Sequence, residues 1–266
     1  MRDRLALILP TALIVVAEAA FFQGLLTASL SVHLFNIFLC VLLVIVTKRS
    51  EDLYASFILV SLLRVLNISM PRFFELSLYL FIFIYLPIII AAFIFWYVLK
   101  VPEGRKIDGP LMWRFLNGVG PDEAPTFRWV YVPLALGIGL VLAFLEYWVL
   151  SPEALVPSMG LGDLMLLMTV MVVFVGLGEE LVFRVALQES VRERSTVIIA
   201  ILFSSFMFAI MHSGYQSVPY LFYVFFVGLV LGIAYWRTRN LLFVALIHGF
   251  INFFLFSFLP NGWWPW

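Results

Sequence analysis

The sequence predicts an all-α protein, a polytopic transmembrane helix bundle of about eight to nine spans. The first observation is composition, because 64% of the 266 residues are hydrophobic and only 12% are charged. Soluble domains contain about 45–50% apolar and roughly 25% charged residues. The second observation is the mean hydropathy of +1.09, which also indicates a membrane protein. The third observation is a series of apolar runs near the length of about 20 residues that a transmembrane helix needs.

Nine apolar stretches are candidates for these spans, and eight is the alternative count because the second and third are short or interrupted. They cover residues 5–30, 33–47, 53–70, 76–99, 130–150, 162–188, 196–213, 219–236 and 241–259. Residues 1–129 would hold the N-terminal helices with a polar cytoplasmic loop at 100–128, and residues 130–266 the later helices. The N-terminal run is too long for the apolar part of a signal peptide, so we interpret it as a retained span.

Basic residues predict the orientation of the bundle, since Lys and Arg accumulate in cytoplasmic loops. They occur at the N-terminus, at 48–49, in the 100–128 loop, at 192–194 and at 237–239, whereas intervening connections such as TASLSVH contain only Arg72. We therefore expect a multi-pass cell-membrane protein with its N-terminus cytoplasmic and its C-terminus outside. The net charge of +0 indicates no nucleic-acid partner, and a single cysteine, Cys40, indicates no redox chemistry.

Several polar side chains fall within the predicted spans, where a charged group costs at least about 2.5–3.5 kcal/mol on insertion scales. The densest group is Glu179, Glu180 and Arg184 in FVGLGEELVFR. Residues four apart share a helix face, so Glu180 and Arg184 can pair while Glu179 points about 100° away. The other polar residues are Glu18, Arg64, Asn67, Glu146, His212, His248 and Asn252. Glu146 lies near a helix end, where we expect its carboxylate to reach the interface.

Two further pairs of residues are spaced by one helical turn in later helices. FAIMH places Phe208 one turn before His212, and HGFIN places His248 one turn before Asn252. A single buried His or Asn usually joins helices through a hydrogen bond of about 0.6–2 kcal/mol. Two carboxylates and two histidines on three of the late helices instead favour proton transfer or metal binding.

These three motifs resemble those of a known protein family. EELVFR (179–184) matches its EExxxR motif, FAIMH (208–212) its FxxxH motif and HGFIN (248–252) its HxxxN motif, in the family's order and spacing. The family is the CPBP family of CAAX-processing and bacteriocin-processing intramembrane proteases. The resemblance covers about residues 162–259 and implies that residues 130–266 form a CPBP-type catalytic core.

The resemblance implies hydrolysis of a peptide bond in a membrane-anchored peptide or protein. Glu179 would activate a water with help from His212, and His248 and Asn252 would stabilise the oxyanion. The supporting residues would be Glu180, Arg184 and Phe208. A carboxylate in a medium of low dielectric constant is a better base, and donors aimed at the oxyanion lower the barrier by about 3–4 kcal/mol.

Two alternatives are left open by the sequence. The histidines and glutamates could bind Zn²⁺, although there is no HExxH sequence and the resemblance favours a mechanism without a cofactor. The chain could also be a non-enzymatic membrane protein, either a proton-coupled carrier or an inactive scaffold. Carriers often contain inverted repeats, which we do not find, and no motif residue is missing. The substrate and the oligomeric state are not predicted.

Straight helices would keep the motif residues apart. Glu179 lies about nine residues, or about 14 Å, from the cytoplasmic end of its span, whereas His212 lies near the outer end of the next. We therefore expect a helix that is broken, tilted or begins deep in the bundle. The sequence does not predict the membrane face to which a cavity would open.

Glu18 and Arg64 are predicted to form an interhelical ion pair. They lie about 13 and 11 residues into spans that both run outward, so each side chain is roughly 17–20 Å deep. Charged side chains at this depth usually form an ion pair with a side chain of opposite charge. We expect this contact, with Asn67 nearby, to order the N-terminal helices without a part in the chemistry; a place in the substrate path is the alternative.

Overall fold

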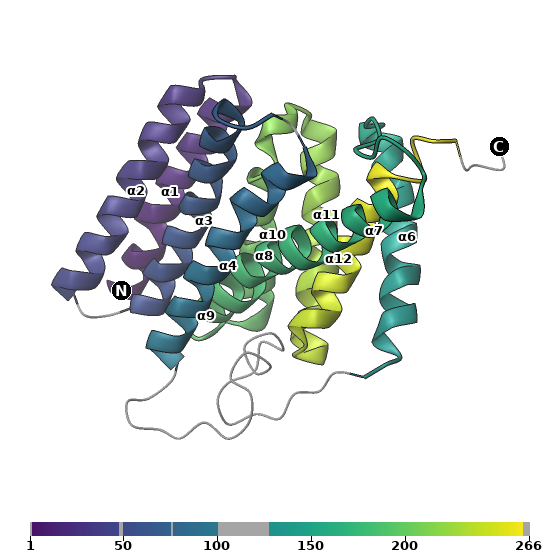
Figure 1. Ribbon diagram of the computed structural model, residues 1–266. Coiled ribbons are helices and arrows are strands. Elements are labelled where there is room, and N and C mark those ends of the chain that lie inside the picture. The colour runs from purple at the N-terminus through teal and green to yellow at the C-terminus, as the bar shows by residue number, and fades with distance from the viewer. Residues whose placement is uncertain (1, 48–49, 76, 101–127, 263–266) are drawn as a thin grey trace.

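The computed structural model describes residues 2–47, 50–75, 77–100 and 128–262, and within them it contains helices and connections but no strand (Figure 1). Seven helical stretches in this part of the chain are long and apolar enough to cross a membrane. Two shorter apolar helices, Leu7–Phe22 and Leu241–Phe256, accompany them. The predicted all-α bundle is therefore confirmed, and the number of helices agrees with the predicted range.

The described residues of the N-terminal part form four long helices and one short 3-10 helix. These are α1 (Arg2–Phe22), α2 (Leu26–Thr47), α3 (Glu51–Ser69), η1 (Met70–Arg72) and α4 (Leu78–Lys100). The boundary predicted between the first two spans was wrong. The chain reverses at Gly24, whose φ of +78° is a conformation that glycine adopts without strain. TASLSVH, expected as a connection, is consequently helical, and His33 is buried in the bundle.

The later part contains four separate helices and one long composite helix. The separate helices are α6 (Tyr131–Leu150), α10 (Val197–Ile210), α11 (Val218–Thr238) and α12 (Leu241–Phe256), with the 3-10 helix η4 (Ser213–Tyr215) after α10. The composite helix consists of α7 (Leu161–Thr169), the π-helical η2 (Val170–Gly176), α8 (Leu177–Glu180), the π-helical η3 (Leu181–Gln188) and α9 (Glu189–Arg192).

The composite helix crosses the bundle obliquely (Figure 1). Its 32 residues correspond to about 48 Å of helix at 1.5 Å per residue, which exceeds the hydrocarbon thickness of about 30 Å. The tilt expected from the motif positions is thus present. The π-helical segments lie on either side of Glu179 and Glu180, and such wide turns often occur at functional sites.

Glycines allow α12 to approach the composite helix closely. A Cβ atom at Gly249 would lie 2.5 Å from Val172 Cα, and one at Gly176 would lie 2.7 Å from the Ala245 carbonyl oxygen. Small residues at membrane helix interfaces bring backbones together in this way. The close approach places His248, the neighbour of Gly249, directly beside the glutamates.

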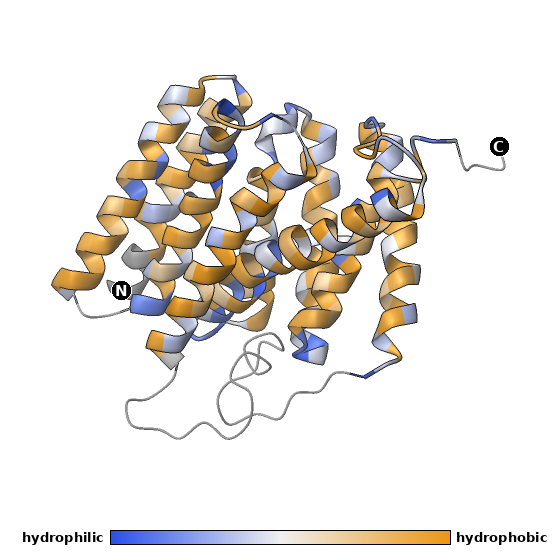
Figure 2. Ribbon diagram, viewed as in Figure 1, coloured by the Kyte–Doolittle hydropathy of each residue, from blue (hydrophilic) through white to orange (hydrophobic). Residues whose placement is uncertain are grey.

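Hydrophobic residues cover the sides of the helices, as Figure 2 shows. Many large apolar side chains are exposed there, among them Phe38, Ile45, Tyr79 and Phe222. An apolar surface of this extent is unfavourable in water but matches the interior of a bilayer. The structure is therefore that of a multi-pass membrane protein.

Candidate active site

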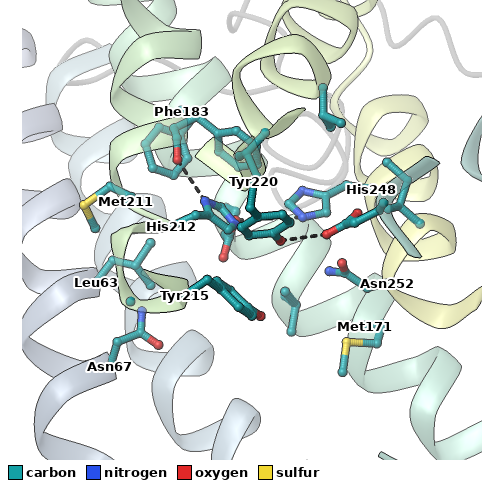
Figure 3. A pocket seen from close by; sticks show the side chains of 18 of the residues that line it. Leu63, Asn67, Met171, Phe183, Met211, His212, Tyr215, Tyr220, His248 and Asn252 are labelled. Carbon is teal, nitrogen blue, oxygen red and sulfur yellow. Dashed lines mark hydrogen bonds and ion pairs between the residues drawn. The ribbon is translucent and has the colours of Figure 1, made fainter. Parts of the chain in front are cut away.

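A cavity of about 510 Å³ lies among α1, α3, α4, α6, the composite helix, α10, α11 and α12. All four predicted catalytic residues line it: Glu179, His212, His248 and Asn252. Figure 3 shows the two histidines and Asn252 around this space. The structure therefore brings the three motifs together, as the catalytic hypothesis requires.

Glu179 is the carboxylate that faces the cavity. The Tyr85 hydroxyl of α4 donates a hydrogen bond to its Oε1 atom. Its Oε2 atom has no hydrogen-bond partner among the described residues and lies 3.8 Å from His248 Nε2. Buried polar atoms are nearly always hydrogen-bonded, so Oε2 is the atom of this site that requires a further partner.

Glu180 has a different environment although it is the next residue. Its side chain is fully buried, and Arg184 Nε donates to its Oε2 at 2.8 Å. His248 Nδ1 lies 2.9 Å from its Oε1, and a carboxylate accepts, so Nδ1 carries the hydrogen. The helical rotation of about 100° per residue explains why the two carboxylates face different partners. The predicted Glu180–Arg184 contact is present.

His248 lies between the two glutamates and beside an aromatic wall. Nδ1 binds Glu180, and Nε2 points toward Glu179. The Phe208 ring stands edge-on to the His248 imidazole, with the centroids 5.6 Å apart, and lies 4.8 Å from the His212 ring. The Arg184 guanidinium lies 5.2 Å from the same Phe208 ring. Phe208 thus separates the two histidines and fixes their spacing.

His212 follows the end of α10, and its ring folds back along that helix. Nδ1 lies 2.9 Å from the Phe208 carbonyl oxygen. A carbonyl only accepts, so Nδ1 is the donor, and in the neutral ring Nε2 is left as an acceptor. Side chains on a helix point back toward its N-terminus, which carries this imidazole from the helix end toward the middle of the bundle. The tilt of the composite helix and this backward direction together account for the meeting of Glu179 and His212 at one cavity.

The predicted contact between Glu18 and Arg64 is present. Arg64 Nε and Nη2 donate to the two carboxylate oxygens of Glu18, each at 2.8 Å. Glu18 also contacts His33 Nε2 at 3.1 Å and accepts a hydrogen bond from Ser213 Oγ at 2.5 Å. Arg64 Nη2 donates in addition to the Met211 carbonyl oxygen. The pair is therefore the centre of a buried network.

This network touches the chain on both sides of His212. Met211 and Ser213 are the sequence neighbours of that histidine, and each is bonded to one member of the ion pair. Arg64 and Asn67 also line the cavity. The Glu18–Arg64 pair is thus adjacent to the candidate site as well as joining the N-terminal helices.

Three side chains of the site were missed or misplaced by sequence reasoning. Glu146, expected at the interface, is buried, lines the cavity and accepts a hydrogen bond from the Tyr220 hydroxyl at 2.7 Å. The expected interfacial position was therefore wrong. Tyr220 and Tyr85 were not considered at all. A usable signal existed, since a tyrosine in an apolar helix requires a partner for its hydroxyl.

Within the described part of the chain, no three His, Cys, Asp or Glu side chains are arranged so that they could hold a metal ion. Glu180, beside the cavity, and His248, in its lining, are already engaged with each other. Both Glu180 oxygens are hydrogen-bonded, and the His248 Nδ1 atom is one of their donors. The arrangement is suited to proton transfer between carboxylate, imidazole and a bound water.

Residues 161–254 match a family model described as "Type II CAAX prenyl endopeptidase Rce1-like". The predicted family resemblance is confirmed. The matched segment contains all three motifs, whereas α1 to α4 and α6 lie outside it. The Rce1-like family implies an intramembrane endopeptidase that acts on a membrane-associated substrate. No curated protein and no solved structure matches the chain.

Proposed function

We propose that this protein is an intramembrane endopeptidase in which Glu179 activates the attacking water. The observation that carries the proposal is the difference between two adjacent carboxylates. Glu179 lines the cavity and has an unpaired oxygen, whereas Glu180 is enclosed by Arg184 and His248. A general base must be within reach of the proton it removes, and of the two only Glu179 meets that condition.

The water would bind between Glu179 Oε2 and His248 Nε2. These atoms are 3.8 Å apart, so one water can lie about 2.8 Å from each, which is a normal hydrogen-bond distance. Glu179 would remove a proton as the water oxygen bonds to the carbonyl carbon of the substrate. His212, whose Nε2 is an acceptor, would assist this transfer.

The tetrahedral intermediate would be stabilised from α12. The Asn252 side chain lines the cavity one turn beyond His248, and its amide group supplies donors for an oxyanion. The proton held by Glu179 would then pass to the amide nitrogen of the substrate. The carbon–nitrogen bond breaks, and a carboxylic acid and an amine are released.

We propose that this reaction needs no metal ion. The proposal is supported by the hydrogen bond between Glu180 and His248 Nδ1. It is also supported by the side-chain arrangement, because among the described residues no three His, Cys, Asp or Glu side chains are placed to hold a metal ion. Zinc dependence is the alternative. Purified protein that has been treated with a strong chelator and dialysed should retain its activity. Stoichiometric zinc, with activity restored only when zinc is added back, would contradict the metal-free mechanism.

The decisive experiment compares Glu179→Gln with Glu193→Gln. Glu193 is an exposed residue after α9, so its substitution is a matched control for the loss of one carboxylate. Each protein would be reconstituted into vesicles with membrane proteins from cells that lack it, and new peptide termini would be identified by mass spectrometry. General-base catalysis typically contributes 10²–10⁴-fold, so termini produced by the wild type and by Glu193→Gln should be lost in Glu179→Gln.

Cleavage by Glu179→Gln at more than about a tenth of the wild-type rate would contradict the assignment, given that expected loss. The absence of any new terminus with folded wild-type protein would instead favour a non-enzymatic membrane protein.

We also propose that the N-terminus is cytoplasmic and the C-terminus lies outside. The proposal is supported by the ends of the described helices. Arg194 and Arg239 lie at the end of the bundle where α10 and α12 begin, whereas the turn at 212–217 holds no Lys or Arg. Basic residues are retained on the cytoplasmic side.

A further inference from the structure

The cavity occupies one half of the bundle. The helices that run outward in the proposed topology contribute residues near their C-terminal ends. These residues are Phe21 of α1, Arg64 and Asn67 of α3, Glu146 of α6, Met211 and His212 after α10, and Asn252 and Phe256 of α12.

Two helices that run in the opposite direction contribute residues near their N-terminal ends, whereas the composite helix contributes Glu179 and its neighbours from its middle. α4 begins at Leu78 and supplies Phe81 and Tyr85 to the cavity. α11 begins at Val218 and supplies Tyr220 and Tyr223. The C-terminal ends of the outward helices and the N-terminal ends of α4 and α11 lie at the same end of the bundle. Both groups of helices therefore place the cavity toward that end.

The same end of the bundle provides an approach to the cavity. Gly214 and Tyr215 of the short helix η4 are exposed and also form part of the cavity wall. In the opposite half, the interior around the composite helix is closely packed, with a small cavity of about 50 Å³ between α3, α4 and that helix. Leu181, Val182 and Leu187 are each at most 1% exposed. A polar peptide segment would therefore reach Glu179 from the end that carries η4.

Positive charge is concentrated at the other end. The chain has 16 Lys and Arg residues. Arg64 and Arg184 are buried in the bundle, and Arg72 is at the cavity end. The rest lie in sequence at, or beyond, the ends of helices opposite to the cavity. A distribution this uneven indicates that the end opposite to the cavity is cytoplasmic.

From these two observations together we infer that the catalytic cavity opens to the non-cytoplasmic side of the membrane. This inference rests on the proposed function and specifies its substrate class. The substrate is an exported, membrane-anchored chain whose scissile bond lies in the outer half of the bilayer or just outside it. Proteins anchored to the cytoplasmic face are not the expected substrates, because their cleavage sites would have to pass the closely packed half of the bundle, where Leu181, Val182 and Leu187 are buried.

The orientation is tested by labelling single cysteines, independently of any activity. Cys40, the one native cysteine, is buried and would be replaced in a Cys40→Ser background. Asn261→Cys marks the end next to the cavity, because Asn261 follows α12, and Glu193→Cys marks the opposite end; both positions are exposed. A membrane-impermeant maleimide applied to intact cells should label Asn261→Cys, and should label Glu193→Cys only after the membrane is opened. The reverse pattern would overturn the inference.

The substrate class is tested on the new termini that depend on Glu179. Intact cells would be treated with an added protease before their membranes are analysed, so that segments outside the membrane are removed. The termini made by the wild type and not by Glu179→Gln should lie in segments that this treatment removes. Termini in protected cytoplasmic segments would overturn the inference while leaving the proposed protease activity intact. If no new terminus depends on Glu179, the proposed function is contradicted. The cysteine labelling then tests by itself the side of the membrane to which the cavity opens.

Discussion

Two buried Glu–Arg pairs support the candidate site from different parts of the chain. Glu180 and Arg184 lie one turn apart on the composite helix, whereas Glu18 and Arg64 join α1 to α3. In each pair the Arg Nε atom donates to the carboxylate at 2.8 Å, and in each a histidine binds the same carboxylate.

The two ion pairs are hydrogen-bonded to different groups of the candidate site. The Glu180–Arg184 pair holds His248 by its Nδ1 atom. The Glu18–Arg64 pair holds the backbone and the serine next to His212. The family match includes Glu180 and Arg184 but not Glu18 and Arg64. One of the two ion pairs that hold the histidines in place therefore lies outside the matched segment.

The largest expected effect is the removal of either arginine. Arg184→Met would leave Glu180 buried without its cation, and Arg64→Met would do the same to Glu18. Breaking one side of a buried ion pair typically costs about 3–5 kcal/mol. We expect both variants to show lower thermal unfolding temperatures in detergent, and Arg184→Met to lose all cleavage. Unchanged unfolding in Arg64→Met would show that the N-terminal pair contributes little to the fold.

Reversal of each pair should separate a structural role from a positioning role. The double change Glu18→Arg with Arg64→Glu keeps both charges between α1 and α3, so we expect it to recover part of the stability lost in Glu18→Ala. The equivalent reversal of Glu180 and Arg184 places a cation beside His248 Nδ1, which needs an acceptor.

We expect that second reversal to remain inactive even where folded protein accumulates. Folded and active protein from the reversed Glu180–Arg184 pair would show that the acceptor for His248 is dispensable. The measurements are the yield of monodisperse protein and the rate of cleavage.

The smallest expected effect concerns one hydroxyl group. Ser213→Ala removes the hydrogen bond to Glu18 Oε2, a loss of about 1.5–3 kcal/mol for a bond to a charged group. Ser205→Ala is the matched control, because Ser205 is buried on α10 and its hydroxyl has no partner within the described residues. We expect lower thermal stability and slower cleavage for Ser213→Ala only. Equal behaviour of the two variants would argue against a link between the N-terminal network and His212.

Sequence reasoning was most successful where one helix contains the whole feature. The Glu180–Arg184 contact follows from a spacing of four residues, and the different direction of Glu179 follows from the rotation per residue. The Glu18–Arg64 contact could also be predicted. The charged loops give the direction of each span, and the number of residues from the loop gives the depth of each side chain. The end of α1 was misplaced because the turn at Gln23 and Gly24 interrupts the apolar run for only two residues.

The amino-acid sequence by itself determined that this is a multi-pass helical membrane protein, which residues carry the three motifs and which end of each helix is basic. These properties depend on composition and local spacing. Only the tertiary structure decided which carboxylate faces the cavity, that Tyr85 and Tyr220 bind the cavity glutamates, and that the network around Glu18 reaches His212. Those contacts depend on how each helix is tilted and rotated against its neighbours. Helical periodicity fixes directions within one helix and leaves its packing to side chains far away in sequence.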